Sequence, residues 1–333
     1  MDLFRSCTNM AARRCGAGQG GPMRRWPTAP TPPVLLAAVV LAVLIGFSAC
    51  SRSALPDAKV VILGSGNPNA DPLHSGPAVA VISEGKVYLV DAGPGVVRRA
   101  AAAHNAGVAE LTMPALNRVF ITHLHSDHTL GLPDLMLSPW VLDRTDPLTV
   151  YGPPGVAAMV AHLTAAYGDD IDNRLHGLEP INKTGWRTRA VEVLPGIVYR
   201  GDGMTVTAFA VQHAGFEHAY GYTFQTPGRR IVVSGDTLPS AEIVAQCNGC
   251  DVLVHEVYSE AGLMTRPKDW QNYHVHSHTS TVQLAQIAKQ ARPKLLVLYH
   301  QLFWGSTDDD LLREIKAAGY DGKVVSAHDL DVY

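Results

Sequence analysis

Four side chains that can bind metal lie close together near the middle of the chain: His123, His125, Asp127 and His128. The apolar, β-branched run 117–122 precedes them and predicts a buried strand, so the four side chains follow a strand's end. Imidazole and carboxylate groups bind Zn²⁺, and catalytic zinc sites use about three protein ligands and leave a position for water. We expect His123 and His125 to face one metal ion, and Asp127 and His128 to face a second. A histidine-rich polar loop without metal is the alternative.

The same arrangement recurs along the chain, because other apolar strands are followed by side chains that can bind metal or protons. These side chains are His213, Asp236, His255, Glu256 and His300. Open sheets build their sites at the carboxyl ends of strands, so we expect these groups to gather at one edge. Asp91 follows the predicted strand 86–90. It either caps a turn or holds the histidine loop from behind, and we favour the second role.

The predicted elements begin at residue 59 and are dominated at first by strands. Strands are predicted at 59–64, 78–83, 86–90, 148–151, 190–194, 204–213, 219–225, 231–234, 251–254 and 295–299. Helices are predicted at 96–105, 156–167 and 281–290. The segment 168–188 is polar and poor in strand signals.

The 333-residue chain carries a net charge of −3, with 47% apolar and 17% charged residues. These values are typical of a globular protein with a sizeable core, organised as one large or two modest domains. Nucleic-acid-binding proteins usually present a basic face, and this net charge supplies no overall attraction to RNA or DNA. Composition therefore argues weakly against a nucleic-acid partner.

The first fifty residues carry the features of an export signal. Residues 34–47 are apolar and uncharged, and they follow the basic pair 24–25. This run is shorter than the roughly 20 residues that a membrane-spanning helix needs, so we interpret it as the core of a signal peptide. Small residues directly before Cys50 resemble the bacterial lipoprotein box, although Phe47 stands where that motif prefers Leu. By this resemblance Cys50 carries the lipid.

We therefore expect an exported protein of the bacterial cell envelope, either a membrane-anchored lipoprotein or a periplasmic protein. An uncleaved N-terminal anchor is the alternative. Met23 is a candidate for the true start. The predicted organisation is a leader at 1–50, a short linker at 51–57 and one folded domain at 58–333.

Two cysteines, Cys247 and Cys250, lie in the predicted domain, whereas Cys7, Cys15 and Cys50 lie in or before the leader. A lone C-x-x-C pair lacks the four ligands of a structural zinc site. In an oxidising compartment we expect a local disulfide, with two free thiols as the alternative.

The motifs together resemble the metallo-β-lactamase superfamily, and more narrowly its branch of ribonuclease Z and related arylsulfatases and phosphodiesterases, over roughly residues 58–333. The motifs are Thr-His-Leu-His-Ser-Asp-His at 122–128, His213, Ser-Gly-Asp-Thr at 234–237, His-Glu at 255–256, Ser-His-Thr-Ser at 277–280 and Leu-Tyr-His at 298–300. The resemblance implies an α/β (α+β) fold, a four-layer αββα sandwich of two mixed β-sheets flanked by helices.

The same resemblance implies two Zn²⁺ ions per chain, with Mn²⁺ or Fe²⁺ as possible substitutes. One ion would be held by His123, His125 and His213. The other would be held by Asp127, His128 and His300, and Asp236 would bridge the two. A hydroxide between the metals would attack the substrate.

The resemblance also implies Asp127, His278 and Glu256 as the catalytic residues. His278 would protonate or stabilise the leaving group, and Glu256 would orient its ring. A histidine held by a carboxylate is expected to have a raised pKa. The alternative is that 277–280 only caps the following helix.

Several other side chains have no assigned role. We expect His74, His274 and His276 to be solvated loop imidazoles, although His274 and His276 could line the substrate entrance. Trp270, Tyr273 and Trp304 could stack on an aromatic substrate, but such aromatics more often pack at a rim or in the core.

The segment 214–235 is long enough for a hairpin but not for the tRNA-gripping arm that bacterial ribonuclease Z carries there. We therefore expect a hydrolase of small sulfate or phosphate esters, membrane-attached through its lipid, with a homodimer possible. The alternatives are a ribonuclease Z-type RNA 3′ endonuclease, a β-lactam or lactone hydrolase, and a non-catalytic zinc-binding lipoprotein.

Overall fold

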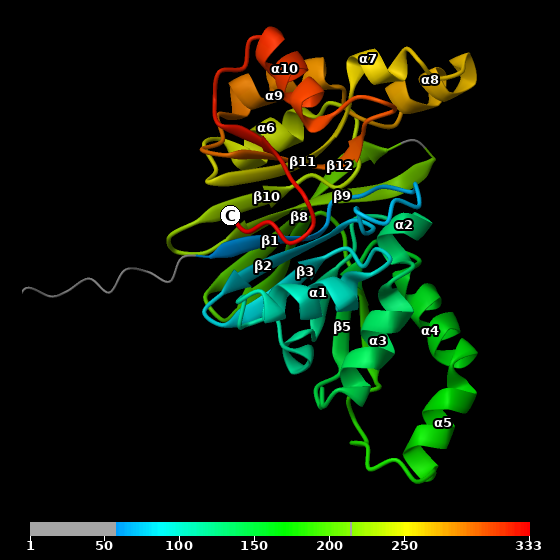
Figure 1. The fold of residues 1–333 in the computed structure, drawn as a ribbon. Coiled ribbons are helices and arrows are strands. Elements are labelled where there is room, and N and C mark those ends of the chain that lie inside the picture. The colour runs from blue at the N-terminus through cyan, green and yellow to red at the C-terminus, as the bar shows by residue number, and fades with distance from the viewer. Residues whose placement is uncertain (1–57, 214) are drawn as a thin grey trace, which may run out of the picture. The chain divides into compact units, whose positions relative to one another are not determined.

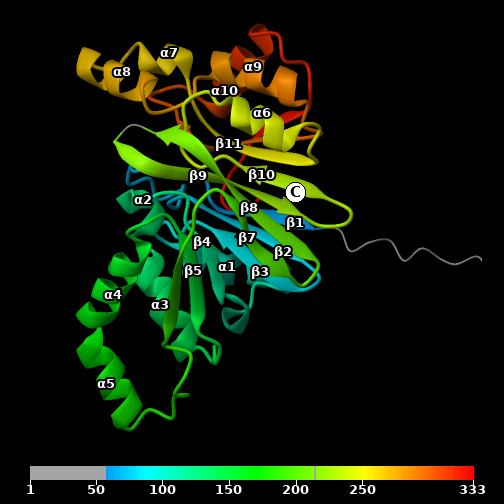
Figure 2. The same cartoon turned by 180° about the vertical axis from the view of Figure 1, so that it is seen from behind.

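Two β-sheets lie face to face, and helices cover the outer face of each sheet (Figures 1 and 2). The computed structural model describes residues 58–213 and 215–333. The predicted leader, Cys50, Met23 and the linker 51–57 lie outside the described residues. The predicted four-layer αββα sandwich with two mixed sheets is confirmed.

The first sheet has six strands, placed side by side in chain order. The strands are β1 (Lys59–Gly64), β2 (Ala78–Ser83), β3 (Lys86–Val90), β4 (Arg118–Phe120), β5 (Leu148–Gly152) and β6 (Thr188–Glu192). The pairs β1–β2 and β2–β3 are antiparallel, and β3 to β6 are parallel. The parallel half therefore brings the carboxyl ends of β3, β4 and β5 to one edge.

The second sheet has seven strands in the order β13-β12-β11-β10-β9-β8-β7. The strands are β7 (Gly196–Gly201), β8 (Met204–His213), β9 (Phe216–Gln225), β10 (Arg230–Val233), β11 (Val252–Tyr258), β12 (Leu296–Leu302) and β13 (Val324–Ser326). β7 to β10 pair antiparallel, and β10 to β13 pair parallel. The segment between His213 and Asp236 consists of two hairpin-linked strands, β9 and β10, as the sequence predicted.

Helices of the first half of the domain lie beside the first sheet, and helices of the second half lie beside the second sheet (Figure 1). The first group is α1 (Val96–Asn105), α2 (Ser126–Thr129), α3 (Leu132–Val141), α4 (Val156–Ala166) and α5 (Gly168–His176), with the 3₁₀ turn Met113–Ala115. The second group is α6 (Ala241–Cys247), α7 (Glu260–Leu263), α8 (Lys268–Val275), α9 (Thr281–Ala291) and α10 (Asp308–Ala317). None of the helices in the described part is both long and apolar enough to span a membrane.

Strands with two buried faces explain the continuous apolar runs of the sequence. In β1, Val60 and Ile62 belong to the core between the sheets, whereas Val61 and Leu63 belong to the core under the first helical layer. All four side chains are fully buried. Fully burying such a side chain contributes about 1.5–3 kcal/mol to folding, so each sheet is fixed from both sides.

Several elements differ from the sequence prediction, which named only three of the helices (α1, α4 and α9) and ended β11 at residue 254, before His255 and Glu256. The segment 168–188 includes the helix α5, and the edge strand β7 was not predicted. β7 is largely exposed and its glycine ends weaken the strand signal. β12 continues past its predicted end to Leu302.

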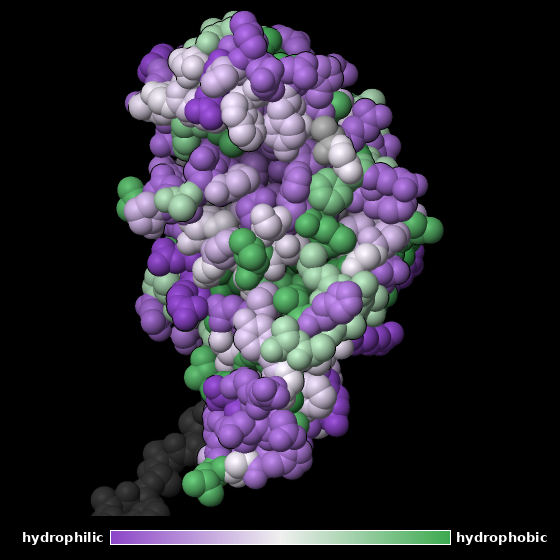
Figure 3. All heavy atoms as spheres, turned by 90° about the vertical axis from the view of Figure 1, so that its right-hand side faces the viewer, coloured by the Kyte–Doolittle hydropathy of each residue, from purple (hydrophilic) through white to green (hydrophobic). Residues whose placement is uncertain are grey.

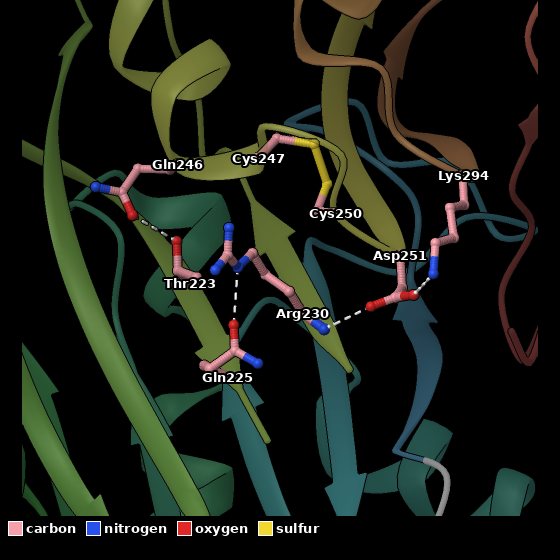
Figure 4. Close-up of a disulfide and its surroundings, with 8 residues drawn as sticks. All are labelled: Thr223, Gln225, Arg230, Gln246, Cys247, Cys250, Asp251 and Lys294. Carbon is pink, nitrogen blue, oxygen red and sulfur yellow. Dashed lines mark hydrogen bonds and ion pairs between the residues drawn. A yellow bond between two sulfur atoms is a disulfide. The ribbon is translucent and has the colours of Figure 1, made fainter. Parts of the chain in front are cut away.

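A disulfide joins Cys247, the last residue of α6, to Cys250, and the predicted local disulfide is confirmed (Figure 4). Both cysteines are buried. Nearby, Asp251 accepts a hydrogen bond from the backbone of Arg230 and pairs with Lys294. These contacts fix the turn that leads into β11.

Candidate metal centre

The loop after β4 is tied to both sheets before it reaches the histidines. The backbone N–H of Tyr220, in β9, donates to the Thr122 carbonyl at 2.9 Å, and the Tyr222 hydroxyl donates to the Ile121 carbonyl at 2.8 Å. His125 then begins the short helix α2, whose first turn contains Asp127 and His128. The strand fixes the first two ligands and the helical turn directs the other two back to the same edge.

Two histidines from the loop meet a third from the end of β8. The Nε2 atom of His123 lies 2.9 Å from Nδ1 of His125, and the Nε2 atom of His213 lies 3.1 Å from the same Nδ1. Together with Asp236 these side chains form one group whose ligand atoms lie within 4.8 Å of one another. The structure therefore brings together the ligand set expected for the first ion.

A second group contains the remaining ligands. His300 Nε2 lies 3.2 Å and His128 Nε2 lies 3.5 Å from Oδ2 of Asp127. His300 occupies a β-bulge, because Glu256 and Val257 of β11 pair with Tyr299 and Gln301 of β12. Its φ of 48° lies in the left-handed region, so the bulge turns this ring toward the site from within a strand.

Asp236 lies between the two groups. Its Oδ1 is 3.3 Å from His128 Nε2, and its Oδ2 is 3.4 Å from His300 Nε2 and 4.0 Å from His213 Nε2. A carboxylate has two oxygens, so one side chain can reach both groups. We call these seven side chains the metal cluster: His123, His125, Asp127, His128, His213, Asp236 and His300.

The distal nitrogens of the histidines are held by neighbours. His128 Nδ1 lies 2.8 Å from Oδ2 of Asp91, and His213 Nδ1 lies 2.8 Å from the Ser277 carbonyl oxygen. That oxygen can only accept, so Nδ1 of His213 carries the proton and Nε2 is free to bind metal. Such contacts orient ligands in metal sites and raise their basicity.

Asp91 holds the histidine loop, as the favoured interpretation expected. Its Oδ1 accepts a hydrogen bond from the backbone N–H of Thr122 at 2.8 Å. Its φ of 61° is left-handed, and its own N–H donates to the Phe120 carbonyl at 2.9 Å. Asp91 therefore connects the ends of β3 and β4 to the ring of His128.

Burial controls the protonation of the first group. It lowers the pKa of His123 well below its usual value, that of His125 to about 4, and that of His213 as well. These three imidazoles are therefore neutral near pH 7, and each can offer a lone pair to a metal ion.

In the second group, buried carboxylates and imidazoles shift one another's pKa values. Burial opposes the protonation of His128, but the carboxylates of Asp236 and Asp91 raise its pKa well above the usual value. Burial would raise the pKa of Asp236, yet the imidazoles of His300 and His128 hold it well below the usual value. An ionised carboxylate is thus favoured at the centre of the cluster.

The donor set fits divalent metal ions. The structure holds Asp236 Oδ1 and His128 Nε2 in buried positions without a hydrogen-bond partner among the described residues. A buried polar atom without a partner costs about 1–3 kcal/mol, and a metal ion at this point would satisfy both atoms. Histidine and carboxylate ligands of this kind suit Zn²⁺, Mn²⁺ and Fe²⁺.

His278 lies at the edge of the metal cluster and beside Glu256. Its Nδ1 is 3.4 Å from Glu256 Oε2 and 3.9 Å from Asp236 Oδ2. The other oxygen of Glu256 accepts from the backbone N–H groups of Thr237 and Thr279. His278 also forms a possible ligand group with Asp236 and His300, so distance alone permits a ligand role.

The expected raised pKa of His278 is wrong. Burial lowers its pKa to about 4, and burial together with Asp236 raises the pKa of Glu256 to about 8. Desolvation therefore outweighs the attraction between the two side chains. The helix-cap role of this segment is real as well, because Ser280 forms a capping box with Gln283 at the start of α9.

A cavity of about 620 Å³ opens above the metal cluster. Figure 3 faces this edge of the molecule and shows a hollow below the upper lobe. Five side chains that line the cavity come from the segment around α8 or follow β12: Arg266, Trp270, Tyr273, His274 and Trp304. This volume is typical of a site for one small molecule.

The unassigned histidines differ in position. His274 is buried, with its ring centroid 4.4 Å from that of Trp304, so the expectation of a solvated ring is wrong for this residue. His276 is exposed and bonds to the Asn272 carbonyl. His74 is half-buried, with Nδ1 2.8 Å from the Ser65 hydroxyl. No motif in the sequence pointed to Arg266, which lies in an irregular turn between α7 and α8.

A family model described as "Beta-lactamase superfamily domain" matches residues 86–301. A ribonuclease Z from Mycobacterium sp. (strain KMS) is 34% identical over 246 residues, which cover 73% of this chain and 84% of that protein. One from Mycolicibacterium gilvum is 32% identical over 282 residues, covering 82% and 94%.

Solved structures share the fold. The short form of human tRNase Z has a TM-score of 0.61 at 23% identity, covering 83% of this chain and 98% of that one. A diphosphatase of the PhnP family has a TM-score of 0.57 at 19% identity, covering 83% and 97%.

Proposed function

We propose that this chain, which belongs to the β-lactamase superfamily and is a homologue of ribonuclease Z, acts on small phosphodiesters. The family membership makes the chain a metal-dependent hydrolase of ester bonds. Small sulfate esters are the related alternative. The position of Asp236 between the two ligand groups, at the base of a cavity of about 620 Å³, carries this proposal.

The metal cluster divides between two ions. His123, His125 and His213 would hold one ion, whereas Asp127, His128 and His300 would hold the other, with Asp236 shared. When bound, two such ions lower the pKa of a water nucleophile and offset the charge that develops on the ester. Asp91 and Ser277 keep two of the imidazoles in orientation, so the ligands are arranged before the substrate arrives.

His278 stabilises the leaving oxygen through the N–H of its neutral ring, and Glu256, whose pKa burial raises to about 8, positions this ring and can supply the proton that Nδ1 takes up. The contact between His278 Nδ1 and Glu256 Oε2 supports this role, because it leaves Nε2 of the ring as the nitrogen that meets the substrate. His278 also lines the cavity, where a leaving group would lie. Asp127 contributes to catalysis as a ligand in the second group, together with His128 and His300.

Three observations favour a small substrate over RNA. The segment from His213 to Asp236 is occupied by the strands β9 and β10, joined by residues 226–229, in the place of an RNA-gripping arm. The net charge of −3 supplies no general attraction to a polyanion. The cavity also matches one small molecule in volume.

RNA 3′ endonuclease activity is the second candidate, and the 34% identity to mycobacterial ribonuclease Z favours it. A panel of chromogenic phosphodiesters and sulfate esters should be assayed beside a precursor tRNA, with metal content measured on the same sample. Turnover of phosphodiesters without tRNA cleavage is the expected result. Cleavage of the tRNA with inert small esters would replace our proposal by the second candidate.

We also propose that the protein is exported and anchored by lipid on Cys50. The disulfide between Cys247 and Cys250 supports this location, because disulfides persist mainly in oxidising compartments. Labelled lipid should attach to the wild type and not to Cys50→Ser. Soluble chains that begin near Ser51 without an acyl group would contradict the anchor.

A further inference from the structure

One side of the cavity is formed by four ring-bearing side chains, which we call the aromatic wall: Trp270, Tyr273, His274 and Trp304. The His274 ring is stacked on Trp270, with centroids 5.7 Å apart and planes 24° apart. The ring of Trp304 packs against the same imidazole, with centroids 4.4 Å apart and planes 53° apart. Buried His274 therefore joins two tryptophans into one continuous surface.

The wall reaches the reaction site. The centroid of His278 lies 5.4 Å from that of His274 and 6.2 Å from that of Tyr273. The outer residues remain open to solvent, since Trp270 is 50% exposed and Tyr273 is 37% exposed. A flat group bound beside the scissile phosphate would cover this exposed apolar area.

Arg266 adds a positive charge at the same cavity. Its Nε is buried without a hydrogen-bond partner among the described residues, and none of the arginine ion pairs found among them involves Arg266. Its backbone is fixed on both sides, because its N–H donates to Leu263 and its carbonyl accepts from Gln271. Asp269 also lines the cavity, but it is exposed.

We infer that the preferred substrate carries, beyond the scissile phosphodiester, a flat ring that stacks on the aromatic wall and a second anionic group that binds Arg266. A nucleotide with an additional phosphate has this chemistry. Arginine recognises phosphate through parallel N–H donors, and base stacking on aromatic side chains tolerates any base. This inference rests on the proposed phosphodiesterase function and defines its substrate more closely.

Three chromogenic substrates separate the two contacts. All three carry the same nitrophenyl leaving group, so their differences report the added groups alone: methyl p-nitrophenyl phosphate adds neither, the p-nitrophenyl ester of thymidine 5′-phosphate adds a base, and the 3′-phosphorylated form of that ester adds the second anion. We expect kcat/KM to rise about tenfold or more with the base and again about tenfold or more with the anion.

The variants should remove these gains one at a time. Trp270→Leu should abolish the gain from the base, and Arg266→Gln should abolish the gain from the added phosphate. Both should lose far less on the methyl ester than on the ester that carries the matching added group, and both should keep wild-type metal content. Tyr167→Leu and Arg200→Gln are matched controls, because both residues are exposed and lie outside the cavity lining.

Binding provides a readout that does not depend on turnover. Calorimetry with thymidine 3′,5′-bisphosphate should show tighter binding than with thymidine 5′-phosphate, and Arg266→Gln should remove that difference. Equal kcat/KM on the three esters, or equal losses on all of them in both variants, would overturn the inference and leave the phosphodiesterase proposal standing. Inert esters with intact bisphosphate binding would support the Arg266 site and refute the proposed activity.

Discussion

The metal cluster and the aromatic wall share one cavity but are supported in different ways. The cluster lies where the two sheets meet, and its ligands are almost all buried. The wall lies mainly on α8, a short helix with a largely exposed surface. The core of the fold thus fixes the groups that perform the chemistry, whereas an outer helix supplies the groups that contact the rest of the substrate.

Backbone strain occurs on both sides of this division. Asp91 and His300 both have left-handed φ angles of 61° and 48°, which cost about 1–3 kcal/mol each for a non-glycine residue. Both are held in place by neighbouring strands. On the wall side, Trp304 is also left-handed, with φ of 46°, and the following Gly305 continues the turn. Strain at the site is therefore stored where strands or a packed ring can stabilise it.

The largest effect should come from Asp236→Ala, because this residue contacts both ligand groups. We expect a loss of roughly 10³-fold or more in kcat/KM, with metal content falling from about two ions per chain. Elemental analysis and a phosphodiester assay on the same preparation measure both quantities. The exposed Asp321→Ala is the matched control. Chelation of the wild type should have the same effect, and a fully active, metal-free protein would refute the metal-dependent assignment.

The next effect distinguishes acid catalysis from metal binding. General acid catalysis contributes about 10²–10⁴-fold, so His278→Ala should lose that much on an alkyl phosphodiester. The loss should be far smaller on a nitrophenyl ester, whose leaving group needs no proton. Rates on the two substrates test this contrast, and Glu256→Gln should show the same contrast more weakly.

Metal content supplies the control for His278. The His278→Ala protein should retain the wild-type amount of metal. Equal losses on both esters, or a missing ion, would assign His278 to the ligand shell with Asp236, a role that the distances also permit.

The sequence predicted the metal cluster well because its signals are local. Four ligands lie within residues 122–128, and His213 and Asp236 follow apolar strands, so strand ends alone brought them to one edge. The four-layer fold was implied by the resemblance of the motifs to a known family, and the runs of two-sided buried strands agree with it. The bulge at His300 could not be predicted, because it depends on the register between β11 and β12.

Contacts between distant segments also escaped prediction. Arg144 is fully buried and has no carboxylate partner among its described hydrogen bonds. It donates to four backbone carbonyls: those of Leu116, Leu135, Met136 and Gly185. A charged residue in a polar stretch predicts exposure, and only the packing of three segments reverses that expectation. The burial of His274 and the position of Arg266 at the cavity also depend on tertiary packing and could not be predicted from the local sequence.

A smaller effect, on stability, tests the packing beneath the metal cluster. A Cβ atom on Gly93 would lie 2.3 Å from the backbone carbon of Gly76, so Gly93→Ala must displace one of two backbone segments close to Asp91. We expect a loss of roughly 1–3 kcal/mol in the free energy of unfolding, with weaker metal binding. Gly168→Ala is the matched control, because its added methyl group meets no atom within 4 Å. If thermal unfolding showed equal stability for both variants, the close packing at Gly93 would not support the metal cluster as proposed.

The smallest effect should come from the aromatic wall. Trp270 is 50% exposed and belongs to α8, outside the buried hydrophobic clusters. Surface substitutions usually change the free energy of unfolding by no more than about 0.5 kcal/mol, so Trp270→Leu should keep the wild-type melting temperature and metal content. Thermal unfolding of Trp270→Leu beside Gly93→Ala measures the contrast directly. If Trp270→Leu unfolded as easily as Gly93→Ala, the wall would be part of the structural support of the cluster, and its loss of activity could not be assigned to substrate binding.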